Sequence, residues 1–451
     1  MKPANKAAPG KAAWIHPAWR CLGELILFFG VLSLCFSVSL CVATYMACPF
    51  GDEWWVITDI ARGSGPSSLS WLWSQHNEHR IAIARILIWA DLFRFGGTNK
   101  SLFVEIFLVQ ILHLAVIAWV IEKWTGLDRT VRRTVQGLFA FCLFHPNQQE
   151  NFTWAFQISF VMPFAITTTS FLLISFYEEV RGVWRRLLTS AFIAFAPFIA
   201  ALNMAGALAA GPALLIIGVA KRLRPQLLAG LALVFVISGG LYLVGHEPID
   251  ASDTPARAIH DPRGIWLYML TYFGASWTKL LPHKERIAAF VSFMAYLASV
   301  GRALRVRERV SNLEWFCLGE CTFVLGVAFV TALGRIHLGP GQAFASRYQT
   351  PAMIYWASLG ALGLLLAARR WPERFPVVQG ALAIVLLLSM LTWRSAWQVA
   401  VLRGVELQNA CSAVMAGRAG DSEVKALHID AGLEPAATFL RKRQMAPLVA
   451  P

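Results

Sequence analysis

The sequence predicts an all-α, polytopic membrane protein with about eleven transmembrane helices. Hydrophobic residues make up 57% of the 451 residues and charged residues only 15%, a more apolar balance than a single soluble core uses. Apolar runs reach the roughly 17–25 residues that a helix needs to cross about 30 Å of hydrocarbon. They recur from one end of the chain to the other, and no separate soluble domain is visible.

The first apolar run, from Leu22 to Ala47, predicts a retained membrane anchor. At 26 residues it is longer than the apolar core of a signal peptide. The predicted crossings lie near residues 22–47, 101–122, 134–145, 157–177, 187–203, 205–220, 226–245, 287–302, 313–334, 350–368 and 376–393. They form one transmembrane domain, residues 22–393, between an amino-terminal tail of residues 1–21 and a tail of residues 394–451.

The distribution of Lys and Arg predicts the orientation. Basic residues collect in alternate connections, whereas residues 145–156 and 203–206 contain none. The basic groups are Lys2, Lys6, Lys11 and Arg20; Lys123, Arg129, Arg132 and Arg133; Arg181, Arg185 and Arg186; Lys221, Arg222 and Arg224; Arg302, Arg305, Arg307 and Arg309; and Arg369, Arg370 and Arg374. Short basic loops stay cytoplasmic, so we expect tail 1–21 inside and tail 394–451 outside. Basic loops facing anionic lipid also account for the net charge of +14 without a nucleic-acid partner.

Most of the eight cysteines fall inside predicted helices, where a small buried apolar side chain is the usual role. Cys317 and Cys321 are one helical turn apart and lack the Cys-x-x-Cys spacing of a zinc or redox site. Cys48 and Cys411 both fall on the predicted outer side, where they could form a disulfide or stay unpaired.

The first outer loop, residues 48–100, begins with two carboxylates. Asp52 and Glu53 are followed by apolar residues at helical spacing as far as Arg62. A second apolar stretch, Ile81–Phe93, is too short and too charged to span comfortably. We therefore expect two interfacial juxtamembrane helices that frame Asp52. The acidic pair is either catalytic or an ordinary pair stabilised by the dipole of the helix that follows.

The connection between these two helices contains a polar stretch with His76, Glu78, His79 and Arg80. They either bind a substrate or form a structural hydrogen-bond network. A divalent cation could bind there, although His-x-Glu-His is not the spacing of a recognised zinc helix.

The third predicted crossing is short. Val135–Phe144 contains only ten residues, about 15 Å of helix. The polar run that follows, with Gln149 and Glu150, is therefore expected below the outer membrane surface. Irregular polar backbone at that depth is tolerated where it contacts protein or lines a water-filled cavity. The run predicts an outward-facing polar cavity, or else packing against the two surface helices.

The segment Gly334–Tyr348 brings Arg335, Arg347 and Tyr348 to the outer side before the tenth crossing. Arginine at a helix start suits a phosphate oxygen, because its fork of donors stays charged and binds bidentately. Arg347 could equally be an interfacial anchor. Asn203, at a tight outer turn, is expected to complete this polar rim. Three basic residues of a long outer loop are expected there too: Lys279, Lys284 and Arg286.

The arrangement resembles the GT-C superfamily of membrane glycosyltransferases. The shared features are an inside amino terminus, acidic residues after the first helix, two interfacial helices, many further crossings and an outer tail. Segments 76–80, 151–157 and 346–348 also resemble a group of bacterial multi-spanning proteins of largely unassigned activity. The chain lacks the large folded outer domain and the aromatic-Asp signature of the best-defined GT-C branches.

The GT-C resemblance implies a site and its partners. It implies Asp52 or Glu53 at the reaction centre, and basic outer-loop residues, Arg347 first, at a lipid phosphate. The implied donor is a sugar linked to polyprenyl phosphate, and the implied acceptor is a glycan, lipid or protein of the cell envelope. The implied location is the bacterial inner membrane.

The same chemistry follows from the residue types. Sugar transfer from a phosphate needs a carboxylate to take a proton from the acceptor hydroxyl, and cations to stabilise the departing phosphate. Asp52 is the expected base, and Arg347, Arg335 or Arg80 the expected cation. The alternatives are a secondary transporter or lipid flippase, and a non-catalytic envelope assembly protein. Polar clusters on one side only, without internal repeats, favour the enzyme over the transporter.

Overall fold

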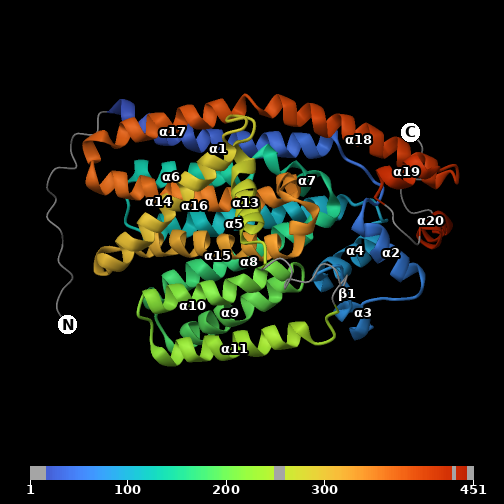
Figure 1. Cartoon of the computed structure of the whole chain (residues 1–451), viewed down its shortest axis with the longest axis horizontal. Helices are drawn as coiled ribbons and strands as arrows, with labels where there is room; N and C mark the ends of the chain where they lie inside the picture. Colours follow the sequence, from blue (N-terminus) through green and yellow to red (C-terminus); the bar gives the residue numbers. More distant parts are fainter. Residues whose placement is uncertain (1–16, 248–259, 429–432, 444–451) are drawn as a thin grey trace.

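The computed structural model describes residues 17–247, 260–428 and 433–443, which are almost entirely helical. Most helices run side by side along the long axis of the molecule (Figure 1). The only strands within these ranges are β1 (Gln75–His76) and β2 (His79–Arg80), which pair as a short antiparallel hairpin. The predicted all-α class is confirmed. Most of the predicted tail 1–21 lies outside the described residues.

Nine helical segments in the described ranges are long and apolar enough to cross a membrane. They are built from α1 (Pro17–Ala43), α5 (Lys100–Trp124), α8 (Ile158–Ser175), α9 (Val183–Ala201), α11 (Pro225–Leu243), α14 (Glu285–Arg305), α15 (Asn312–Arg335), α16 (Gln349–Arg370) and the successive helices α17 (Phe375–Met390) and α18 (Trp393–Met415). The other two predicted crossings coincide with shorter helices, α6 (Arg129–Leu143) and α10 (Ala210–Ala220). The chain has the helices of a multi-pass membrane protein, with nine rather than eleven of spanning length.

The two ends of the bundle differ in composition. The connections at one end, on the left in Figure 1, are rich in arginine; we call this the basic end (residues 123–133, 178–186, 221–224, 302–309 and 369–374). The opposite end, which we call the loop end, is formed by α2 (Asp52–Ala61), α3 (Leu69–Trp73), α4 (Ala82–Arg94) and α7 (Gln149–Thr153). The predicted alternation of basic and non-basic connections thus corresponds to two opposite ends of the bundle.

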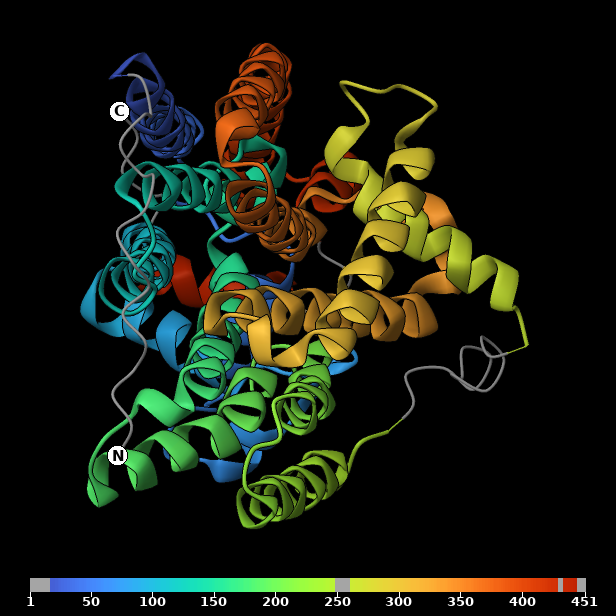
Figure 2. The same cartoon turned by 90° about the vertical axis from the view of Figure 1, so that its left-hand side faces the viewer.

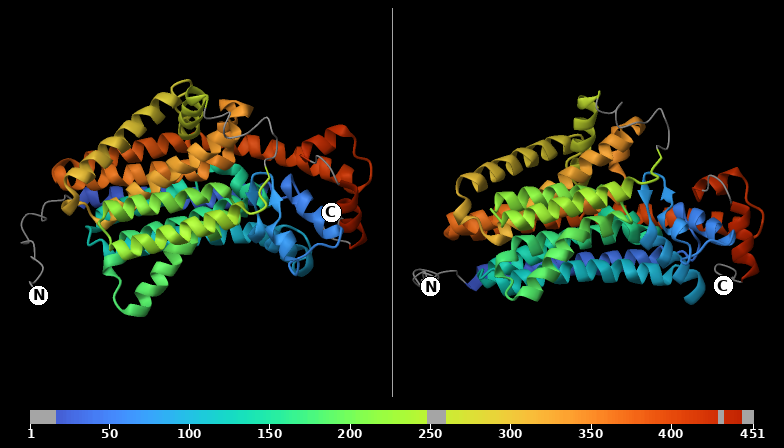
Figure 3. Two further views of the ribbon diagram at one scale, coloured as in Figure 1. Left: turned by 60° about the horizontal axis from the view of Figure 1, so that its bottom comes forward. Right: turned by 90° about the horizontal axis from the view of Figure 1, so that it is seen from below.

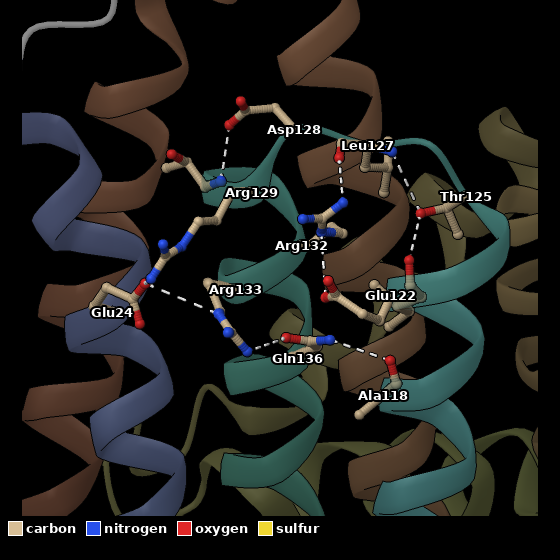
Figure 4. Close-up of polar contacts among 12 residues, drawn as sticks. Glu24, Ala118, Glu122, Thr125, Leu127, Asp128, Arg129, Arg132, Arg133 and Gln136 are labelled. Carbon is tan, nitrogen blue, oxygen red and sulfur yellow. Dashed lines mark hydrogen bonds and ion pairs between the residues drawn. The ribbon is translucent and has the colours of Figure 1, made fainter.

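Ion pairs fix α6 between α1 and α5 at the basic end (Figure 4). Arg129 Nη2 donates to Glu24 Oε1 of α1 at 2.9 Å. On the other side of α6, Arg132 Nε lies 3.3 Å from Glu122 Oε2 of α5. Gln136 links the same two helices, because its Nε2 donates to the backbone oxygen of residue 118 at 3.1 Å.

Helices α1 and α6 pack backbone to backbone. A Cβ atom on Gly137 would lie 2.6 Å from the carbonyl carbon of Ile26, and one on Gly30 would lie 2.6 Å from the Cβ of Ala140. Small residues at such a crossing let the two helices approach closely. Because α1 leads into α2 and α6 leads into α7, this contact positions the two short helices relative to each other.

The two helices predicted in the first outer loop are present as α2 and α4, and both are packed into the protein. Arg85 and Asp91, which make the second stretch too charged to span, are only 3% and 2% exposed. Arg85 Nη1 donates to the backbone oxygen of Ser74 at 2.6 Å, and Asn99 N donates to Asp91 Oδ2 at 3.0 Å. These bonds connect α4 to the connections on either side of it.

The carboxy-terminal part of the chain returns to the loop end. Helix α19 (Asp421–Ala426) packs on α18, and α20 (Leu433–Lys442) packs on α2 (Figures 1 and 3). Cys411 of α18 forms a disulfide with Cys48, so of the two alternatives for this pair the disulfide is confirmed. The bond joins the end of α18 to the connection between α1 and α2.

Candidate functional site

Asp52 is the first residue of α2 and lies beside the β1–β2 hairpin. His76 Nε2 is 3.2 Å from Asp52 Oδ1, and the Asp52 side chain is 31% exposed. Gly51 has a φ of 56°, and a Cβ atom there would lie 2.8 Å from the ring of Trp154. Only glycine meets both requirements without strain. The position of the carboxylate therefore depends on the glycine that precedes it.

The chain before Asp52 is held from two sides. Trp154 Nε1 donates to the backbone oxygen of Phe50 at 2.9 Å. Gly51 N donates to the backbone oxygen of Leu427 at 3.0 Å. The polar run after α6 and the carboxy-terminal part of the chain thus both fix the start of α2.

The surroundings of Asp52 favour its ionised form. Burial raises the pKa of Asp52, but the hydrogen bond and charge of His76 and the charge of Arg347 outweigh this and hold it below its ordinary value of 3.8. A partly exposed carboxylate that stays ionised can accept a proton or orient a hydroxyl group.

Glu53 has a different environment from its neighbour. It is 1% exposed, and its carboxyl group accepts hydrogen bonds from Phe156 N at 3.0 Å, Asn99 Nδ2 at 3.0 Å and Phe50 N at 3.3 Å. Burial raises its pKa to about 8 despite these three donors. The side chain joins α2 to two other segments and does not face solvent, so it is placed to support Asp52.

Arg347 and Glu150 bring the segment before α16 to α7. Arg347 Nη1 lies 3.8 Å from Glu150 Oε2, and Arg347 N donates to the same oxygen at 3.2 Å. The guanidinium is 5.4 Å from the ring centroid of Tyr348. The Arg347 side chain is 25% exposed, so it can be reached from outside while Glu150 holds it.

A second arginine–glutamate pair lies beside the hairpin. Arg335 Nη2 donates to Glu78 Oε2 at 2.8 Å, and the two side chains are 26% and 30% exposed. His79 Nδ1 accepts a hydrogen bond from Ala205 N at 3.3 Å. Burial lowers the pKa of His79, so its ring stays neutral. The pKa of His79 is influenced by the charges of four neighbours: Glu78, Arg335, His76 and Asp52. These residues therefore lie close together and form one polar cluster around the hairpin.

Three further residues predicted for the site, Arg80, Asn203 and Gln149, are not among these clustered groups. Arg80 is 1% exposed, stacks 4.4 Å from the ring of Trp73 and donates to the backbone oxygens of residues 73, 242 and 244. Its donors are therefore used within the protein. Asn203 is 2% exposed and accepts from Ala84 N at 3.1 Å, which braces α4. Gln149 is half-buried at the start of α7, beside Glu150.

The expected contribution of the long outer loop to the polar rim is Lys279, Lys284 and Arg286. Of these, Arg286 makes a hydrogen bond within the protein, because its Nε donates to Thr271 Oγ1 at 2.9 Å. Within the part of the chain that the structure describes, no three His, Cys, Asp or Glu residues are grouped to hold a metal ion. His76, Glu78 and His79 instead contact Asp52, Arg335 and the backbone of Ala205.

Two supporting residues were not selected from the sequence. Asn151 Nδ2 donates to the backbone oxygen of Arg347 at 3.0 Å and to Thr350 Oγ1 at 2.7 Å. Ser346 Oγ accepts from Glu150 N at 3.1 Å. An amide in a polar run after a short apolar helix is the signal that could have identified Asn151.

The fold and the cluster define a multi-spanning helical membrane protein with an ionised aspartate and two partly exposed arginines at one end. No family model, no curated protein and no solved structure matches the chain.

Proposed function

We propose that this protein is a membrane glycosyltransferase that moves a sugar from a polyprenyl-phosphate carrier to an acceptor of the cell envelope. The observation that carries this proposal is the partly exposed Asp52 carboxylate, which His76 contacts and which lies within electrostatic reach of the positive charge of Arg347. Proton transfer to a carboxylate and stabilisation of a departing phosphate by cations are the two requirements of the reaction.

The residues take separate roles in the proposed reaction. Asp52 orients the acceptor hydroxyl and takes its proton, while His76 holds Asp52 in place. Arg347 and Arg335 bind the phosphate of the donor, each kept in position by a glutamate when no donor is present. Glu53 is a positioning residue, because its carboxyl group is buried and accepts hydrogen bonds from Phe156 N, Asn99 Nδ2 and Phe50 N.

The proposed orientation places the loop end outside the cytoplasm. Arginine-rich connections at the opposite end favour a cytoplasmic position for that end. The Cys48–Cys411 disulfide at the loop end is typical of an oxidising compartment. In this arrangement α6 and α10 complete eleven crossings within a bacterial inner membrane, and α2 and α4 lie near the outer interface.

Substitution of Asp52 tests the proposal. Purified protein in lipid vesicles would be given a labelled polyprenyl-phosphate sugar and an envelope fraction as acceptor, and label transfer would be measured. We expect Asp52→Asn to reduce transfer by about 10²-fold or more, since a general base supplies about 10²–10⁴ in rate. Asp59→Asn is the matched control on α2, because asparagine keeps an oxygen for Trp71 Nε1. Full transfer by Asp52→Asn would refute the assignment of the base.

A transporter or lipid flippase is the second candidate, favoured by one observation. Glu320 of α15 is fully buried within a predicted crossing, where ionisable residues are functional hypotheses by default. Glu320→Gln would then abolish passage of a substrate across vesicles, whereas the transferase proposal expects sugar transfer to survive this change. If the wild-type protein shows neither sugar transfer nor substrate passage in these assays, a non-catalytic role in envelope assembly is favoured.

A further inference from the structure

Helix α13 (Pro262–Gly274) carries two buried tyrosines and packs beside the segment that joins Arg335 to Arg347. The helix crosses the direction of the main bundle and lies on a different side from α9 and α11 (Figures 1 and 2). It packs against α15 and against the turns at 336–338 and 340–344, which lie between Arg335 and Arg347. Tyr268 and Tyr272, one turn apart on α13, are both 0% exposed.

The hydroxyl group of Tyr268 lies among groups that donate hydrogen bonds. Burial raises the pKa of Tyr268, the nearby Tyr348 raises it further, and the charges of Arg335 and Arg347 lower it. Both arginines of the cluster are therefore within electrostatic reach of this hydroxyl. Because the net shift is upward, the hydroxyl keeps its proton at physiological pH and can act as a donor.

Among the described residues, this donor has no acceptor in full hydrogen-bond geometry. The hydroxyl group of Tyr348 is close enough to influence the pKa of Tyr268 as a hydrogen-bond partner, but the geometry of this contact falls short of a full hydrogen bond, and no other acceptor is in reach among the described residues. A buried hydroxyl group without a complete hydrogen bond destabilises the folded protein, so a ligand that supplies an acceptor would relieve this. A hydroxyl proton within electrostatic reach of two guanidinium groups suits an oxygen atom of an anion.

We propose that Tyr268 donates a hydrogen bond to the phosphate group of the lipid-linked donor, and so forms one anion site together with Arg335 and Arg347. This inference rests on the proposed function and deepens it, because it assigns a third phosphate-binding residue and a third element, α13, to the site. The alternative interpretation is that Tyr268 has only a packing role, in which case its ring contributes to stability and its hydroxyl group does not contribute to binding.

Tyr268→Phe separates the two readings, because it removes the hydroxyl and keeps the ring. Tyr272→Phe is the matched control: it is equally buried, its ring stacks on Tyr348 at 5.6 Å, and its hydroxyl is influenced by Tyr348 and Tyr268 and by neither arginine. Equilibrium binding of polyprenyl phosphate and, separately, of inorganic phosphate would be measured on the purified full chain. Melting temperatures without ligand would verify that both variants fold.

We expect Tyr268→Phe to raise the Kd for polyprenyl phosphate by roughly tenfold or more, as for loss of a hydrogen bond to a charged group. Tyr272→Phe should change it by less than about twofold. An unchanged Kd in Tyr268→Phe, an equal effect of both variants, or no binding by the wild-type chain would overturn the inference. An effect on inorganic phosphate alone would assign the site to free phosphate and overturn the lipid-donor version.

The same experiment distinguishes this inference from the proposed function. A wild-type protein that binds polyprenyl phosphate through Tyr268 but transfers no sugar would end the transferase proposal and leave the anion site in place. Sugar transfer that is unaffected by Tyr268→Phe at low donor concentration would end the assignment of Tyr268 to the anion site and leave the transferase proposal in place.

Discussion

His76 Nε2 lies 3.2 Å from Asp52 Oδ1 and thereby joins the β1–β2 hairpin to the first residue of α2. The contact explains how a partly buried carboxylate stays ionised, because the effect of burial on its pKa is outweighed by this partner and by Arg347. Substitution of either residue of this pair therefore tests directly how the pKa of Asp52 is set.

His76→Ala is predicted to change the pH dependence of sugar transfer. Asp52 has a pKa below 3.8, so the ionised form, and its contribution to stability, are present above that pH and are lost as the pH falls further. Without His76 the effect of burial dominates, the pKa rises, and the acid limb of the pH–rate profile moves to higher pH. The exposed His260→Ala is the control. An acid limb at the same pH in His76→Ala would contradict this role.

Glu53 is predicted to make the folded protein less stable as the pH rises. Burial raises the pKa of its carboxyl group from 4.5 to about 8, so the folded state holds a proton that the unfolded chain releases above about pH 4.5. The favourable contribution is complete below about pH 4.5 and is lost as the pH rises through about 8.

Glu53→Gln, which stays neutral, should therefore show a flatter dependence of melting temperature on pH between these two values. The exposed Glu373→Gln at the basic end is the control and should keep the wild-type slope. Parallel curves for wild type and Glu53→Gln would show that the Glu53 carboxyl group does not carry this dependence.

Gly137→Ala is predicted to destabilise the protein and to impair transfer together. The added methyl group would lie within 2.7 Å of the backbone of Ile26, which a rotamer change cannot relieve. Overpacking of this kind costs about 1–3 kcal/mol, and here it also separates α1 from α6, which lead to Asp52 and Glu150. Gly380→Ala, with nothing within 4 Å of its added carbon, is the matched control. Melting temperature and transfer rate are the measurements, and equal behaviour of the two variants would count against the close crossing.

Local sequence patterns identified some residues of the site but not others, because some roles depend on neighbours in sequence and others on contacts with distant segments. An acid after an apolar run and an arginine before a helix mark Asp52 and Arg347, because these signals depend on neighbouring residues. Arg80 has the same local character, yet its Nε donates to a backbone oxygen 162 residues further along the chain. No local sequence pattern identifies Tyr268, because its proposed role depends on Arg335 and Arg347, which are distant from it in sequence.

The fold shows the same division. Hydropathy identifies the long apolar helices, because each buries its own backbone hydrogen bonds and needs only length and composition. It also shows that the third crossing is short, but it does not reveal the ion pair between Arg129 and Glu24 that fixes the start of α6 on α1. The close packing of Gly137 on α1 likewise depends on a partner helix that is distant in sequence.

Cys411→Ser is predicted to loosen the start of α2 without breaking the transmembrane bundle. The disulfide to Cys48 closes a loop of 363 residues, and removing such a bond typically costs about 2–4 kcal/mol. We expect faster hydrogen exchange in residues 48–53 and a lower transfer rate. Cys35→Ser, which removes an exposed unpaired cysteine of α1, is the control. In whole cells, a membrane-impermeant thiol reagent should label Cys48 in the Cys411→Ser variant but not in the wild type. Labelling of Cys48 in the variant only after the cells are opened would place the loop end in the cytoplasm and refute the proposed orientation.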